Sequence, residues 1–99
     1  MIAATTGPRV GITGLGTCVP DQIMTNDALA KLVDTTDEWI VERTGIRERR
    51  IATREQALSD IALPAARAAL VDAGVQGSDI DLLIVATVTP DMMFPTTSA

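Results

Sequence analysis

The segment Leu82–Val88 is an unbroken, mostly apolar run rich in β-branched residues, and it limits what this chain can fold into more than any other stretch. Such a run, ended by Thr89-Pro90, is typical of a β-strand that is buried on both faces. A second strand is predicted over Arg9–Cys18, where apolar residues lead to a glycine-rich end. Helical patterns lie between the two, so the sequence predicts an α/β fold, with parallel pairing of the strands.

The intervening helices have local start and stop signals. A short helix is predicted from Asn26, as its N-cap, to Val33. A second begins at Thr35–Glu38, which has the spelling of a capping box, and ends at Gly45. The longest is predicted over about Ser59–Ala73, closed by Gly74, with a stripe of alanines that permits close packing. The stretch 46–52 is expected to be extended but too charged for a central strand.

The composition excludes several classes of function. The chain has 99 residues, 46% hydrophobic and 21% charged, which is the balance of one globular domain. It has no histidine and a single cysteine, Cys18, so it contains no Cys-His dyad, internal disulfide or zinc cage. A net charge of −5 and 2% aromatic residues argue against nucleic-acid binding. No membrane span or signal peptide is visible. The sequence therefore favours a cytoplasmic domain without a metal.

Arginines are concentrated in one window of this acidic chain. Five of the eight basic residues lie there: Arg43, Arg47, Arg49, Arg50 and Arg54. The single acid among them, Glu48, leaves the window at +4 and the rest of the chain at −9. Two interpretations are open, a solvated surface face and a local phosphate site. The absence of lysine favours the second, because the guanidinium fork matches phosphate oxygens in pairs.

Trp39 is the most suggestive single residue. It lies four residues before Arg43 on the predicted helix, so both project from one face. Thr35 stands at the cap of that helix, and Thr44 follows Arg43. An indole can stack on a base, an arginine can hold phosphate and hydroxyls can add hydrogen bonds. The four residues together predict a site for a phosphate-bearing nucleotide, although on spacing alone Trp39 as core filler is the commoner arrangement.

The remaining motifs give weaker indications of function. Gly14-Leu15-Gly16 follows a strand as a dinucleotide fingerprint does, but Val19 stands where the third glycine belongs, and a tight strand exit explains the glycines. Cys18 has no base near it in sequence and is predicted to be a small buried hydrophobe. The loop Asp91–Pro95 holds Met92, Met93 and Phe94, which either cover the core or border a ligand or partner. The stretch 96–98 resembles a helix N-cap.

The stretch Asp34–Arg49 closely resembles the signature of β-ketoacyl-acyl-carrier-protein synthase III, the enzyme that starts bacterial fatty-acid synthesis. The segment from Gly14 to Asn26 also matches, as do Ile84–Thr87 and Phe94-Pro95, so the resemblance extends over nearly the whole chain. It implies a thiolase-like layered α/β fold. Residues 1–99 would be a partial N-terminal domain of a homodimeric enzyme about three times longer.

The resemblance also implies the site. Trp39 would stack on the adenine of coenzyme A and Arg43 would contact its phosphates, with Thr35 and Thr44 nearby. Phe94 would reach across the dimer to border the partner's acyl pocket. Acyl-coenzyme A is then a substrate rather than a cofactor, malonyl-acyl carrier protein is the second substrate, and no metal, nucleic acid or membrane is involved.

No catalytic residue is assigned in this chain. The catalytic Cys, His and Asn of the family are expected beyond Ala99, and Cys18 does not correspond to any of them. Two alternatives stay open. One is a related thiolase-fold acyltransferase of secondary metabolism, which can share the nucleotide-binding block. The other is a non-catalytic fragment that binds nucleotides weakly or does not fold.

Overall fold

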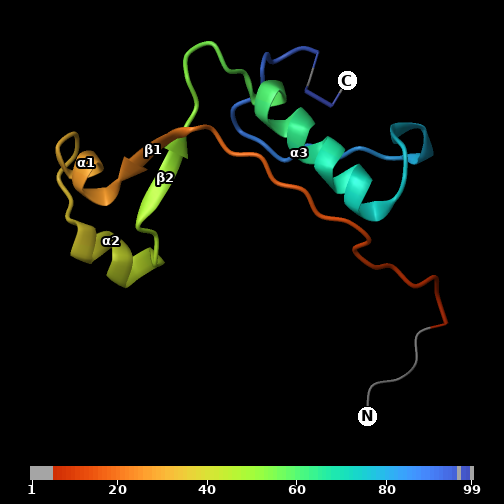
Figure 1. Cartoon of the computed structure of the whole chain (residues 1–99), viewed down its shortest axis with the longest axis horizontal. Coiled ribbons are helices and arrows are strands. Elements are labelled where there is room, and N and C mark those ends of the chain that lie inside the picture. The colour runs from red at the N-terminus through yellow and green to blue at the C-terminus, as the bar shows by residue number, and fades with distance from the viewer. Residues whose placement is uncertain (1–5, 96, 99) are drawn as a thin grey trace.

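Two lobes follow one another along the chain in the computed structural model, which describes residues 6–95, 97 and 98 (Figure 1). Residues 21–51 form the first, here called the hairpin lobe, with the order β1, α1, α2, β2. The second, here called the helix lobe, consists of helix α3 (Leu58–Ala73), the 3-10 turn η1 (Gly77–Asp79) and the irregular segments beside α3. The radius of gyration is 18.5 Å, against about 13 Å for a compact domain of 100 residues, so the lobes do not share one core.

A two-stranded antiparallel sheet organises the hairpin lobe. Strand β1 (Gln22–Thr25) pairs with β2 (Glu48–Ile51), with Gln22 opposite Ile51 and Thr25 opposite Glu48. The stretch 46–52 was expected to be extended, and β2 confirms this. Strand β1 was not predicted, and the only sheet in the described residues is antiparallel rather than parallel.

Both helices of the hairpin lobe are capped by a threonine. Helix α1 (Asn26–Ala30) has Thr25 as its N-cap, whose hydroxyl accepts from the Ala28 N–H, so Asn26 is the first helical residue and not the cap. The helix is also shorter than predicted, since the chain turns after Ala30. Helix α2 (Asp37–Thr44) is capped by Thr36, one residue later than predicted, through a bond of 3.2 Å from the Trp39 N–H.

Helices α2 and α3 each end at a glycine, as predicted. Gly45 closes α2 with φ of 71°, and Gly74 closes α3 with φ of 69°, both in the left-handed region that favours glycine. Helix α3 begins one residue before the predicted start and contains Pro64 in its second turn. Because its N-cap residue is an alanine, Asp91 supplies an outside acceptor, with Oδ1 3.0 Å from the Ser59 amide nitrogen.

The extended segment 14–20 lies along α3 at backbone contact distance. A Cβ placed on Gly14 would stand 2.5 Å from the Ala69 carbonyl oxygen, and one on Gly16 would stand 2.1 Å from that of Ala65. The alanine stripe of α3 therefore does permit close packing, as predicted. The glycines serve this approach rather than a tight strand exit. Cys18 is half-buried in the same segment as a free thiol.

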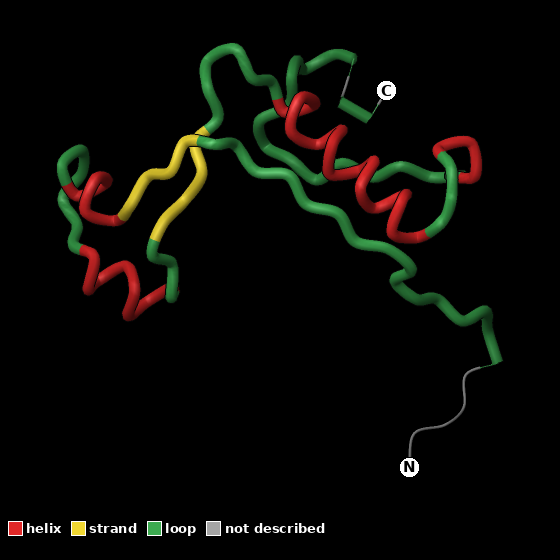
Figure 2. Tube along the Cα trace, viewed as in Figure 1, coloured by secondary structure: helices red, strands yellow, loops and turns green. Residues whose placement is uncertain are grey.

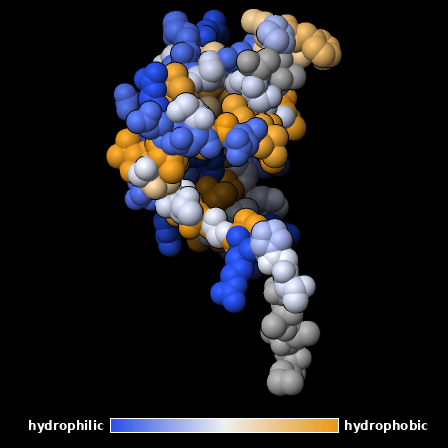
Figure 3. Space-filling view, turned by 90° about the vertical axis from the view of Figure 1, so that its right-hand side faces the viewer, coloured by the Kyte–Doolittle hydropathy of each residue, from blue (hydrophilic) through white to orange (hydrophobic). Residues whose placement is uncertain are grey.

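The two predicted strands are absent from the described residues. Segments 9–18 and 82–88 run beside α3 without strand pairing (Figure 2), and the second is not buried, since Ile84 is 80% and Val88 98% exposed. A strand forms only where a neighbouring backbone accepts and donates its hydrogen bonds. Hydrophobic side chains consequently remain on the surface (Figure 3).

Few side chains are fully buried. Among the described residues, Ile40 is the buried hydrophobic residue and Asn26 the buried polar one. Thr97 and Ser98 lie in a turn, and Thr96 of the predicted N-cap falls outside the described residues. Within the same ranges, no helix has both the length and the hydrophobicity that crossing a membrane requires.

Candidate nucleotide-binding site

Trp39 and Arg43 lie on one face of α2, as the spacing predicted. The guanidinium carbon of Arg43 is 4.9 Å from the centroid of the Trp39 ring, which is a cation–π contact. Trp39 is 53% exposed, whereas the next residue, Ile40, is 8% exposed. Within the described chain Ile40, and not Trp39, is therefore the buried hydrophobic residue of this helix. A flat aromatic face and a cation are both left accessible.

A shallow pocket lies at the N-terminal end of α2, beside the indole. Its volume is about 250 Å³, and it is lined by Asp34, Thr35, Thr36 and Trp39. The Thr36 hydroxyl is already used as the helix cap, so Thr35 supplies the second hydroxyl of the pocket. The pocket thus combines one aromatic wall with small polar groups, which suits a heterocyclic base.

Asp34 is a lining residue that the sequence reasoning missed. Its carboxylate can accept hydrogen bonds from an amino group or a sugar hydroxyl, but it repels phosphate. The pocket and Arg43 therefore differ in charge, with an acid at one side of the indole and a cation over it. Such a separation of charge favours a ligand whose anionic end faces Arg43 and whose uncharged, hydrogen-bonding end faces Asp34. The only available sequence signal was its position next to Thr35.

Thr44 is engaged within the chain. Its hydroxyl donates to the Ile40 carbonyl at 2.7 Å and accepts from the Ile46 N–H at 3.0 Å. Both bonds hold the turn by which the chain leaves α2 at Gly45. In this structure Thr44 shapes the end of the helix next to Arg43.

The arginine cluster disperses in three dimensions. Arg43 lies over the indole, Arg50 donates to the Pro20 carbonyl at 3.0 Å, and Arg49 turns toward Asn26. Alternation along β2 explains part of this, because Arg49 is half-buried and Arg50 exposed on opposite faces of the strand. Arg49 and Arg50 are therefore engaged away from Arg43, and Arg43 is the member that contacts the Trp39 ring of the pocket.

A buried polar cluster beneath α2 was not anticipated. Asn26 is 1% exposed, and its Nδ2 donates to Asp37 Oδ1 at 2.8 Å and to the Ile46 carbonyl at 2.7 Å. Its Oδ1 accepts from Arg49 Nη2 at 2.6 Å. The sequence signal at Asn26 was that of a helix cap, and residues 11 and 23 positions away in sequence gave no sign of meeting it.

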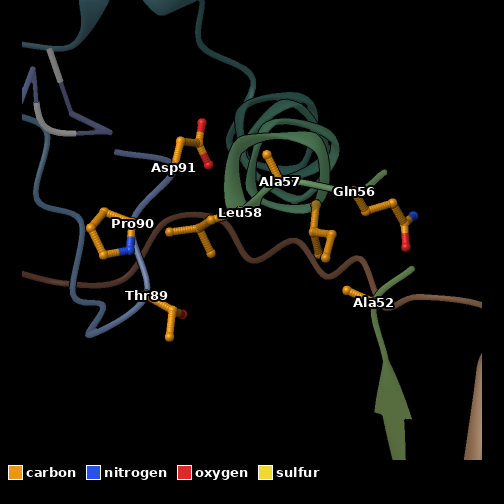
Figure 4. Close-up of a pocket in the computed structure, with 8 residues that line it drawn as sticks. Ala52, Gln56, Ala57, Leu58, Thr89, Pro90 and Asp91 are labelled. Carbon is orange, nitrogen blue, oxygen red and sulfur yellow. The ribbon is translucent and has the colours of Figure 1, made fainter. Parts of the chain in front are cut away.

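Phe94 lies in the predicted loop and is 85% exposed. The same loop closes a second pocket, of about 320 Å³, at the start of α3, where Thr89, Pro90 and Asp91 face Ala57 and Leu58 (Figure 4). Hydrogen bonds from the side chain and backbone of Ser59 lower the pKa of Asp91 below its ordinary value of 3.8. Phe94 is therefore presented outward from a loop that is fastened to α3.

Comparisons with known proteins agree on one family of enzymes. The β-ketoacyl-[acyl-carrier-protein] synthase III of Symbiobacterium thermophilum is 61% identical over 90 residues, and that of Caulobacter vibrioides is 55% identical over 90 residues. Each alignment covers 91% of this chain. No protein-family model matches the chain. The chain spans about 27% of the length of the first relative and 28% of the second.

Solved structures give the same result. The 3-oxoacyl-[acyl-carrier-protein] synthase III of Aquifex aeolicus VF5 superposes with a TM-score of 0.76 at 47% identity, over 86% of this chain and 27% of that one. The priming β-ketosynthase of the R1128 polyketide pathway superposes with a TM-score of 0.64 at 32% identity, over 86% and 29% of the two chains. The predicted α/β, thiolase-like fold is confirmed as a partial match.

Proposed function

On the premise that the chain is homologous to part of β-ketoacyl-acyl-carrier-protein synthase III, we propose that it belongs to an acyltransferase that initiates fatty-acid synthesis. The enzyme condenses acetyl- or acyl-coenzyme A with malonyl-acyl carrier protein. Support comes from identities of 61% and 55% to synthases of that description and from the superposition on the Aquifex enzyme. A homodimer, a cytoplasmic location and an acyl pocket bordered by the partner's Phe94 belong to the same proposal.

In this proposal the chain binds the nucleotide end of coenzyme A. The observation that carries the assignment is the exposed Trp39 ring with Arg43 at 4.9 Å from its centroid, next to a pocket lined by Thr35. The adenine stacks on the indole, and the phosphates pair with the guanidinium. Thr44 contributes by holding the helix end that carries Arg43.

The chemistry lies elsewhere in the enzyme. Condensation proceeds through an acylated cysteine, and residues 1–99 contain no histidine to activate a thiol. The polypeptide 1–99 alone is therefore expected to bind coenzyme A weakly and to produce no condensation product. Formation of product by purified 1–99 would contradict this division of roles.

Two substrates, acetyl-coenzyme A and acetyl-pantetheine, test the nucleotide site in the complete gene product. Arg43→Ala and Trp39→Ala are each expected to raise KM for acetyl-coenzyme A about ten- to a hundredfold, because a charge-assisted bond or a stacking contact is lost. Since the nucleotide is bound equally in ground and transition states, kcat should change little. Acetyl-pantetheine lacks the nucleotide, so its KM should not change.

Arg67→Ala is the control, because it removes an equal charge from the exposed face of α3. An unchanged KM for acetyl-coenzyme A in both α2 variants would reject the nucleotide site.

A priming ketosynthase of secondary metabolism is the second candidate. The superposition on the R1128 enzyme favours it, although at 32% identity rather than 47%. Assays of the complete gene product with acetyl-coenzyme A and with longer acyl-coenzyme A substrates separate the two candidates. A strong preference for acetyl groups supports the primary function, and rejection of acetyl groups supports the second.

A further inference from the structure

The side-chain amide of Asn26 joins the two ends of helix α2. One Nδ2 hydrogen bond reaches Asp37, the first residue of the helix, at 2.8 Å, and the other reaches the carbonyl of Ile46, just beyond its end, at 2.7 Å. Trp39 and Arg43 both lie between these two attachment points. Helices α1 and α2 come between the two strands in sequence (Figure 1). Asn26 is the first residue of α1 and directly follows the last residue of β1.

Asn26 also accepts a hydrogen bond from the guanidinium group of Arg49. Arg49 Nη2 donates to Asn26 Oδ1 at 2.6 Å, whereas its Nη1 is buried without a hydrogen-bond partner in the described part of the chain. The result is a chain of carboxylate, amide and guanidinium from Asp37 to Arg49. All of the polar atoms of the Asn26 side chain are therefore used, and none is available to a ligand. Each member of such a buried chain restricts its neighbours to one geometry.

Few other hydrogen bonds fasten α2 to the sheet within the part of the chain that the structure describes. The remaining backbone link in this region is the Asn26 N–H donating to the Arg47 carbonyl at 3.2 Å. The other bonds of α2, from the Thr36 cap to the Thr44 turn, lie within the helix and its own ends. Within the described residues, the polar links from α2 to the rest of the hairpin lobe thus pass through the Asn26 side chain, while Ile40 supplies the buried apolar contact.

We propose that Asn26 is a positioning residue of the nucleotide site, which holds α2 so that Trp39 and Arg43 face the same ligand. The inference rests on the proposed coenzyme A site on α2. It assigns Asn26 no contact with the ligand. A residue that acts through others should affect the same part of the ligand as they do, and should lose its effect when they are removed.

Two substitutions isolate the donor bonds of the network. Asn26→Asp keeps an oxygen for Arg49 but loses both donors, so both ends of α2 are released. Asp37→Ala removes only the bond at the start of the helix, at a half-buried position. Asp37→Asn is the conservative counterpart, because its amide oxygen can still accept from Asn26 Nδ2. Asp27→Ala is the matched control, an exposed acid on α1 next to Asn26.

The measurement is calorimetric affinity of the complete gene product for coenzyme A and for pantetheine, with the melting temperature of each variant. Asn26→Asp and Asp37→Ala are expected to bind coenzyme A about five- to twentyfold more weakly and pantetheine unchanged. Asp37→Asn should restore affinity to within about twofold of the parent protein. If Asn26→Asp does not fold, the Asp37 pair decides.

Double variants establish whether the effect passes through α2. In an Arg43→Ala, Trp39→Ala background, Asn26→Asp should weaken coenzyme A binding no further. An equal loss in both backgrounds, or a lower melting temperature with unchanged affinity per folded molecule, overturns the inference. If Arg43→Ala and Trp39→Ala alone leave affinity unchanged, the proposed nucleotide site is wrong and the inference falls with it. If those two weaken binding and the Asn26 and Asp37 variants do not, only the inference is overturned.

Discussion

The hairpin lobe and the helix lobe are each stabilised by a different kind of interaction. The hairpin lobe is small, yet its elements are fixed by backbone pairing of β1 with β2 and by the buried bonds of Asn26. The helix lobe has the longest helix and the most hydrophobic segment, yet Leu82–Val88 remains largely exposed. Hydrophobicity alone does not place a segment, because apolar surface is buried only where a partner surface exists. The hydrogen bonds of the Asn26 side chain, by contrast, find their partners within the hairpin lobe.

Hydrogen exchange of the 1–99 polypeptide should show this difference most strongly. The backbone amides of β1, β2 and α2 that are hydrogen-bonded within the hairpin lobe should exchange roughly a hundred- to a thousandfold more slowly than those of Leu82–Val88. Amides of Leu82–Val88 have no strand partner among the described residues and should exchange close to the rate of an unfolded peptide. Equal protection in the two regions, or one cooperative transition that protects both, would contradict the comparison.

The neighbouring residues Ile40 and Trp39 allow the stability of the hairpin lobe to be tested by two alanine variants. Ile40→Ala is expected to lower the free energy of unfolding of the complete gene product by about 3 kcal/mol, because it leaves a cavity at the buried position of α2. Trp39→Ala should cost much less stability, because about half of its surface is already in solvent. Chemical denaturation of both variants provides the measurement. A larger loss for Trp39→Ala would favour the core-filler interpretation of Trp39.

Segment 14–20 gives the corresponding test in the helix lobe. Gly16→Ala places a methyl group against the backbone of Ala65 and Ala69, so overpacking should cost about 2 kcal/mol of stability in the complete gene product. Gly11→Ala is the matched control in the same extended stretch, where a Cβ meets nothing within 4 Å. The same denaturation experiment measures both. Equal stability of the two variants would show that the close approach of this segment to α3 is not maintained.

Sequence reasoning succeeded where the signal is local. Helix α2 was located by its capping-box spelling and Gly45, and α3 by its alanine stripe and Gly74, and these signals act within a few residues. The Trp39 and Arg43 pair was predicted because helical periodicity alone brings residues four apart together. Strand 82–88 was predicted from hydrophobicity, but a strand requires a paired neighbour, and the described chain provides none. The Asn26 cluster was missed because only the folded hairpin brings its members together.

The loop anchor at Asp91 is expected to give the smallest effect. Asp91 is fully exposed, and its bonds to Ser59 lower its pKa below 3.8 in the folded protein. A carboxyl group whose pKa is depressed by folding stabilises the fold above its unfolded pKa, and this contribution is lost as the pH falls through the folded value. Asp91→Asn should therefore lower the melting temperature of the complete gene product slightly at neutral pH. The difference in melting temperature should vanish at a pH below the folded pKa of Asp91, where the parent carboxyl is also neutral.

Melting curves at neutral and strongly acidic pH test this, with Asp81→Asn as an exposed control that makes no such bond. A difference that persists at acidic pH would show that the loop is held to α3 by something other than the charged carboxylate.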